Sequence, residues 1–76
     1  MEIKDFIANF ADQFDETELE EFKPETKYRE LDEWSSLTAL AILSMINKKY
    51  GVKLTPSEVK DYDTIEKLYN LVVSKK

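Results

Sequence analysis

The first fourteen residues alternate between apolar and polar positions with the period of an α-helix. Large apolar side chains recur at spacings of three and four, and at 3.6 residues per turn they fall on one arc of about 100°. They are Ile3, Phe6, Ile7, Phe10 and Phe14. The pattern predicts an amphipathic helix over residues 3–14 whose apolar stripe packs into a core.

The helical pattern stops over residues 15–33. This segment begins with an acidic run, and Pro24 prevents a regular helix through its middle. We expect a long connector, laid over the core by four spaced apolar anchors. An acidic binding loop is the alternative interpretation, and the two are compatible because long loops are often functional. The anchors are Leu19, Phe22, Tyr28 and Leu31.

A second helix is predicted over residues 36–50. Ser35 is a suitable N-cap, because its hydroxyl can accept a hydrogen bond from a free backbone N–H of the first turn. Gly51 suits the left-handed position that ends many helices. Lys48 and Lys49 fall in the last turn, where cations suit the helix dipole.

Two more helices are predicted in the last third of the chain. Thr55 and Glu58 form a capping box with Pro56 at the first helical position, which predicts a short helix ending near Lys60. A second start signal of the same kind begins at Asp63. The last helix then carries an apolar stripe of Ile65, Leu68, Tyr69 and Val72. The predicted fold is therefore all-α, with three main helices, one short helix and a long loop after the first, in a single domain over residues 1–76.

The second helix is apolar on nearly all sides, since eight of the ten residues at positions 37–46 are apolar. A helix of this kind is buried all round or uses its second face for something else, and a domain of 76 residues can hardly enclose one helix. We expect one face to pack into the core, and it holds Leu40, Leu43, Ile46 and Tyr50. We expect the other to meet a partner or a ligand unless the long loop covers it, and it holds Leu37, Ala41 and Met45.

Composition then excludes several functions. The chain has neither cysteine nor histidine, so it lacks a cysteine or histidine nucleophile, a catalytic triad of the usual kind, an imidazole base and a Cys/His zinc site. With 16 acidic and 11 basic residues it is a poor ligand for nucleic acid. No apolar run is long enough to span a bilayer, and the N-terminus lacks the order of a secretory signal. We expect a cytoplasmic monomer that binds no metal and carries or binds something rather than catalysing a reaction.

Charge is divided unevenly along the chain. Positions 1–33 hold 12 acidic and 4 basic residues, whereas positions 34–76 hold 4 acidic and 7 basic residues. An ordinary solvated surface would show such a pattern too. The functional alternative is a partner that is steered electrostatically to one end of the domain.

Two serines stand where the second helix begins. A helix N-terminus presents free N–H groups and favours a phosphate, including one attached covalently to a serine there. Ser35 and Ser36 are therefore candidates for modification, and Ser36 adjoins the apolar Leu37. Capping serines are common, so this signal is weak when it stands alone.

The order of these features resembles that of the acyl carrier proteins. Ser35, Ser36 and Leu37 stand where that family has Asp-Ser-Leu, after a long loop and an apolar first helix. The resemblance extends through Tyr50-Gly51-Val52, Leu54-Thr55-Pro56 and Asp63-Thr64-Ile65, and so covers nearly the whole chain. It implies a four-helix bundle in which Ser36 bears 4′-phosphopantetheine, with Ser35 and Leu37 beside it. Trp34 is expected to cover the core at the helix entry; the alternative is that it borders the arm.

The resemblance also implies a role and partners. The arm's thiol would hold acyl intermediates as thioesters, and the partners would be a phosphopantetheinyl transferase and acyl-loading, condensing or acyltransferase enzymes. The family's second helix usually carries acidic residues that meet partner enzymes, and the sequence has none between Ser36 and Tyr50. This difference favours a specialised fatty-acid, polyketide or envelope-related pathway, whose partners would recognise the apolar face and the acidic loop. Two alternatives stay open: a peptidyl or aminoacyl carrier, and an interaction module that keeps the fold without the arm.

Overall fold

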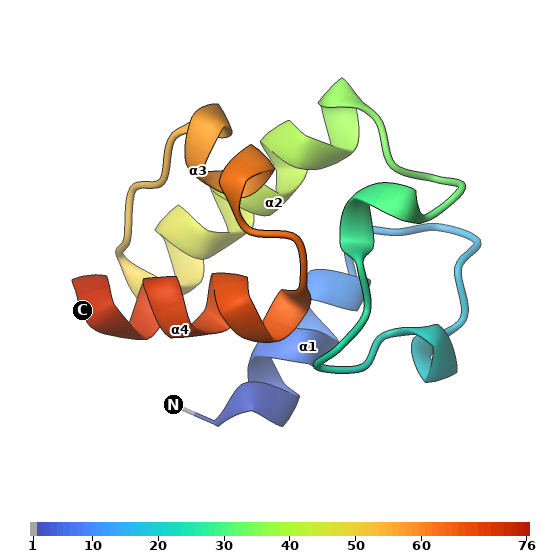
Figure 1. The fold of residues 1–76 in the computed structure, drawn as a ribbon, viewed down its shortest axis with the longest axis horizontal. Coiled ribbons are helices and arrows are strands. Elements are labelled where there is room, and N and C mark those ends of the chain that lie inside the picture. The colour runs from blue at the N-terminus through green and yellow to red at the C-terminus, as the bar shows by residue number, and fades with distance from the viewer. Residues whose placement is uncertain (1) are drawn as a thin grey trace.

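The computed structural model describes residues 2–76, which form four α-helices. Helix α1 spans Ile3–Ala11, α2 spans Ser36–Tyr50, α3 spans Pro56–Asp61 and α4 spans Ile65–Lys75. In Figure 1, α2 lies above α1 and α4, the short α3 lies beside α2, and the connector between α1 and α2 extends to one side of the helices. The all-α bundle with one short helix and a long loop is confirmed.

The helix ends follow from local chemistry. The Ser35 hydroxyl accepts a hydrogen bond from the backbone N–H of Thr38 at 3.3 Å, and Gly51 ends α2 with a left-handed φ of 68°. The Thr55–Glu58 capping box is present in both directions, at 3.2 and 2.9 Å. Each of these caps was predicted from residue type, because the groups involved lie within a few residues of each other.

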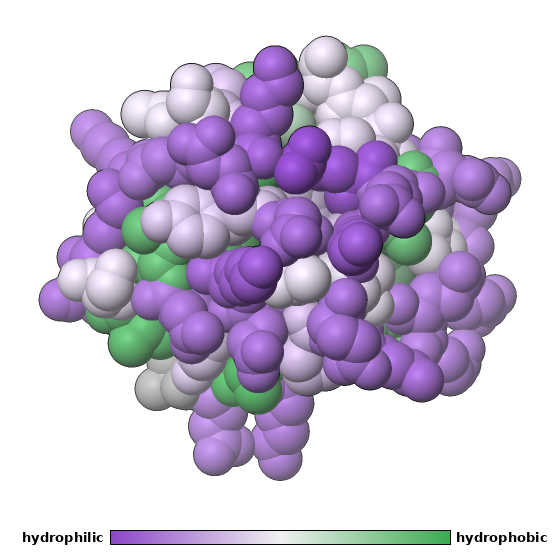
Figure 2. Space-filling model, in the orientation of Figure 1, coloured by the Kyte–Doolittle hydropathy of each residue, from purple (hydrophilic) through white to green (hydrophobic). Residues whose placement is uncertain are grey.

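The core lies where α1, α2 and α4 meet. Phe6, Phe10, Ile42, Ile46 and Leu68 are fully buried there. Helix α1 ends at Ala11, earlier than predicted, yet Phe14 beyond it is still buried. The apolar stripe of the first helix is therefore confirmed, and it continues past the helix itself. On the face of the domain shown in Figure 2, hydrophilic side chains cover most of the surface and apolar ones show only in small separate patches.

The connector contains two short 3₁₀ helices, η1 over Leu19–Glu21 and η2 over Tyr28–Glu30, that the sequence did not predict. Phe22 and Tyr28 are buried, as expected of anchors, and Leu31 is half-buried. The same expectation is wrong for Leu19, which is 58% exposed because η1 turns it toward solvent. The connector also reaches α4, where the backbone N–H of Ile65 donates to the Thr26 carbonyl at 3.2 Å and that of Glu66 donates to the Pro24 carbonyl at 2.9 Å.

The faces of α2 differ from the prediction by about a quarter of a turn. Met45 is 4% exposed and packs in the core, so its assignment to a partner-binding face is wrong. Leu40, expected inside, is 57% exposed, and Leu43 is only half-buried. The inward arc is formed by Ile42, Met45 and Ile46, because these are the positions that α2 turns toward the other helices.

Candidate functional site

Ser36 is the first residue of α2, and its side chain is exposed. The residues before it are held by the cap of Ser35 and by a hydrogen bond from the Thr38 hydroxyl to the Glu33 carbonyl at 2.8 Å. Within the part of the chain that the structure describes, no group accepts from or donates to the Ser36 hydroxyl. The backbone at Ser36 is thus held in place by its neighbours, while the hydroxyl remains available for modification.

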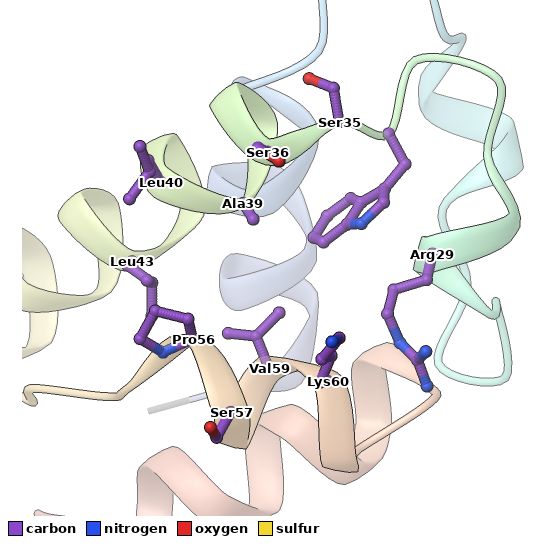
Figure 3. A pocket seen from close by; sticks show the side chains of 11 residues that line it. Arg29, Ser35, Ser36, Ala39, Leu40, Leu43, Pro56, Ser57, Val59 and Lys60 are labelled. Atoms are coloured by element: carbon purple, nitrogen blue, oxygen red, sulfur yellow. The ribbon is translucent and has the colours of Figure 1, made fainter.

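A groove of about 550 Å³ opens beside Ser36, between α2 and α3. Its size is within the usual range of small-molecule sites, about 300–1,000 Å³. Figure 3 shows Ser35 and Ser36 toward one end of the groove and Leu43 and Pro56 toward the other. Most of the lining is apolar: Trp34, Ala39, Leu40, Leu43, Pro56 and Val59, with Arg29, Ser35, Ser36, Ser57 and Lys60 around them.

Trp34 connects this groove to the core. Its indole lies 5.2 Å from the ring of Tyr28 and 6.4 Å from the ring of Phe14, centroid to centroid. The same side chain lines the groove with Ser36. The two interpretations of Trp34, as a cover for the core and as a residue beside the arm site, are therefore compatible in this structure.

Tyr28 holds the connector to the end of α3. Its hydroxyl is 2.5 Å from the carbonyl oxygen of Val59 and within hydrogen-bond reach of the carbonyl oxygen of Tyr62. Burial raises the pKa of Tyr28 to about 12, although the charge of Arg29 acts in the opposite direction. The hydroxyl therefore remains a proton donor at neutral pH, and the α3 wall of the groove is tied to η2.

Glu33 holds the start of the connector. One carboxylate oxygen accepts from the backbone N–H of Glu16 at 2.9 Å and from the backbone N–H and hydroxyl of Thr17 at 2.5 and 2.6 Å. The other accepts from the backbone N–H of Asp15 at 3.2 Å. These donors, the Thr17 hydroxyl first, lower the pKa of Glu33. The Glu33 carboxylate thus joins the end of the connector, next to Trp34, to its beginning at residues 15–17.

We expect this closure to make stability depend on pH. Because the pKa of Glu33 is lowered in the folded state, its contribution is present above the ordinary glutamate value of 4.5 and is lost as pH falls through the folded-state pKa. Glu33→Gln should therefore lower the urea midpoint at pH 7 and reduce the loss of stability on acidification. Glu20→Gln, an exposed change in the same loop, is the matched control. Identical pH profiles for wild type and Glu33→Gln would contradict the role given to this carboxylate.

The predicted partner-binding residues are only partly brought together. Leu37 is 77% exposed and adjoins Ser36, whereas Ala41 is half-buried and Met45 lies in the core. Leu40 joins Leu37 on the outward face in place of Met45. Helix α2 has no acidic residue, as the sequence showed.

Sequence reasoning missed the two cations of the groove. These cations are Arg29, which belongs to η2, and Lys60, which belongs to the last turn of α3. They are 31 positions apart in the chain and share no sequence motif. Nothing in the sequence could have placed them on the groove that Ser36 also lines. Among residues 2–76, no cluster of side chains suited to a metal ion is present, and no helix is long and apolar enough to cross a membrane.

The fold is a small helical bundle with an exposed serine beside a groove. The family model described as the phosphopantetheine attachment site matches residues 5–72, and the chain belongs to that family. Its members bind 4′-phosphopantetheine covalently on a serine, so the function is that of a phosphopantetheine carrier. Such domains interact in general with phosphopantetheinyl transferases and acyl-handling enzymes, and in general are not themselves catalytic. No curated protein and no solved structure matches the chain.

Proposed function

We propose that Ser36 is the serine that carries the arm and that the chain holds acyl intermediates as thioesters. The observation that carries the proposal is the exposed Ser36 hydroxyl, which lines a mostly apolar groove and has no hydrogen-bond partner among residues 2–76. Loading would form a bond between the Ser36 oxygen and the pantetheine-bearing phosphorus of coenzyme A, while the pyrophosphate bond from that phosphorus to the departing adenosine 3′,5′-bisphosphate breaks. The hydroxyl proton would pass to a base on the transferase. When attached, the arm supplies a thiol to which cargo is linked.

The lining of the groove favours an acyl cargo over an aminoacyl one. Helix α2 forms one wall of the groove with Ala39, Leu40 and Leu43, and α3 forms the opposite wall with Pro56 and Val59. Burying an apolar chain against this aliphatic surface lowers the free energy, whereas the surface offers no hydrogen-bond acceptor or opposite charge to an ammonium group.

We place the protein in the cytoplasm, as a monomeric, non-catalytic carrier over residues 1–76, serving a specialised fatty-acid, polyketide or envelope-related pathway.

The partner enzymes are proposed to contact α2 beside Ser36. They would be a phosphopantetheinyl transferase and acyl-loading, condensing or acyltransferase enzymes. Leu37 and Leu40 are the exposed apolar side chains of that face, with the half-buried Ala41 at its edge. Since α2 carries no acidic residue, we expect apolar contact to contribute more than charge to recognition at this helix.

The test is a measurement of intact mass. Incubation with coenzyme A and a phosphopantetheinyl transferase should add one phosphopantetheine unit per chain, and fragment masses should place it on Ser36. An unchanged mass with several transferases, or an arm on Ser35, would contradict the proposal. The mass of the protein isolated from its native host would then identify the cargo as acyl or aminoacyl.

Ser35→Asp should leave the domain as stable as the wild type or slightly more so. The Ser35 oxygen caps Thr38, and aspartate is an equally good N-cap that adds a negative charge near the helix N-terminus, worth about 0.3–1 kcal/mol. The change also restores the aspartate of the related motif, so loading of Ser36 by a general-purpose transferase should be faster. Melting temperatures and the rate of holo-protein formation check the two parts. A clear loss of stability would mean that Ser35 is not the cap, and equal rates would mean that its identity does not limit loading.

A further inference from the structure

The charges that line the groove are all of one sign. Arg29 and Lys60 are its only charged residues, and no carboxylate lines it among the residues that the structure describes. The chain as a whole has 16 acidic and 11 basic residues, so a lining whose charged residues are all cationic runs against its composition. Both side chains are exposed, and neither is within 4.0 Å of a carboxylate in the described part of the chain.

The fold holds these two cations on the same groove. Arg29 follows Tyr28 in η2, and the Tyr28 hydroxyl is bonded to the carbonyl of Val59, the residue before Lys60. Figure 3 shows Arg29 and Lys60 across the groove from α2 and displaced from Leu43 and Pro56 toward the end where Ser35 lies. Two like charges facing one groove repel each other, and an anion bound there would offset that repulsion.

We propose that Arg29 and Lys60 hold the phosphodiester of the arm once it is attached to Ser36. This inference rests on the proposed function. The phosphodiester is the one charged group of the arm, and its attachment to Ser36 places it at the groove that both cations line. Arginine offers several N–H donors to phosphate oxygens, and lysine offers a flexible ammonium group. The apolar lining beyond then receives the uncharged part of the arm.

The contact also counters the charge of the surrounding connector. Positions 1–33 carry 12 acidic residues against 4 basic ones, so a phosphate beside this segment meets an unfavourable field. Glu30 and Asp61 follow Arg29 and Lys60 directly in the chain, yet neither lines the groove. The two cations therefore give the phosphate a local environment of the opposite sign.

Because both cations are exposed, the contact should be modest and sensitive to salt. Exposed ion pairs of this kind change an equilibrium by up to about fivefold each. We expect the ratio of held to free arm to fall about two- to fivefold for Arg29→Gln or Lys60→Gln, and further for the double variant. In wild type, 1 M salt should lower the same ratio by a similar factor. At that concentration the Debye length is about 3 Å, so the attraction between the cations and the phosphate is largely screened.

The experiment uses the loaded proteins and follows the ³¹P resonance of the phosphodiester. In wild type the resonance should differ from that of the urea-unfolded holo-protein at low salt and should move toward it as salt is added. The side-chain Nε–Hε signal of Arg29 should also differ between the apo and holo forms. In Arg29→Gln/Lys60→Gln, the ³¹P resonance should lie close to its unfolded position and respond little to salt.

Matched variants separate position from charge. Lys23→Gln/Lys53→Gln removes the same charge from exposed residues outside the groove and should behave as wild type. Arg29→Lys/Lys60→Arg keeps both charges and should restore the shift. An intact mass with no added arm would overturn the proposed function and this inference together. A loaded Ser36 whose ³¹P resonance is the same in all variants and at all salt concentrations would overturn this inference alone.

Discussion

Ser36→Ala is expected to abolish attachment of the arm completely. The transferase needs a hydroxyl oxygen to form the new bond to phosphorus, and alanine has none. Ser36 is exposed at the first helical position and makes no hydrogen bond through its hydroxyl in the described part of the chain, so the fold should lose nothing. Exposed substitutions of this kind change stability by about 0.5 kcal/mol or less. Intact mass after incubation with transferase and coenzyme A measures the first effect, and the melting temperature measures the second.

Ser57→Ala is the matched control, because Ser57 is another exposed serine that lines the same groove and, unlike Ser35, does not cap α2. It should load like wild type. Loading of Ser36→Ala at the wild-type rate would place the arm on another residue and reject the assignment of Ser36. Loss of loading together with unfolding would show instead that Ser36 supports the start of α2.

Met45→Glu is expected to unfold the domain. Met45 is 4% exposed in the core, and a carboxylate at that position loses its hydration without gaining a partner. The lost burial of methionine alone is worth about 1.5–3 kcal/mol, and the unpaired charge adds several more. A domain of this length has about 4–11 kcal/mol of stability in total, at about 0.05–0.15 kcal/mol per residue. Urea unfolding followed by circular dichroism at pH 7 measures the loss.

Leu37→Glu on the same helix is the control for the Met45 variant. Leu37 is 77% exposed, so the same substitution should leave the urea midpoint nearly unchanged while weakening docking to partner enzymes. A Met45→Glu protein that stays within about 1 kcal/mol of wild type would mean that Met45 faces outward after all. The pair of variants therefore tests which arc of α2 faces the core.

Most of the helix boundaries, although not the end of α1, could be predicted from the sequence because they depend on neighbours in the chain. Ser35 caps Thr38, Thr55 caps Glu58 and Gly51 adopts the left-handed conformation that ends α2. Each signal needs only a residue type and a spacing of a few positions. The position of Ser36 at the start of α2 followed from the same local reasoning.

The faces of α2 could not be predicted in this way. Amphipathic helices reveal their inward side by the polar residues opposite, and α2 is apolar on both sides over positions 37–46. The packing of α2 against α1 and α3 decides that Ile42 and Met45 face inward while Leu40 faces outward. That information is spread over the whole chain, so reading α2 alone gave the wrong arc.

The groove and its supports depend on still longer-range contacts. Glu33 bonds to residues 16 and 17 positions away, and the Tyr28 hydroxyl reaches a carbonyl 31 positions away. An acidic residue in an acidic run gives no sign that its carboxylate closes a loop. The walls of the groove, contributed by η2, α2 and α3, became visible only with the fold.

The connector supplies hydrogen-bond acceptors to the start of α4, and this has a consequence for local opening of the native state. The amides of Ile65 and Glu66 are bonded to the carbonyls of Thr26 and Pro24, and they have no acceptor within α4 itself. Their exchange with deuterated solvent therefore requires the connector to detach, whereas the amide of Leu68, bonded to the Thr64 carbonyl, requires the helix to open. Faster exchange at Ile65 and Glu66 than at Leu68 would identify the connector as a separate cooperative unit that leaves and returns while the helices stay packed.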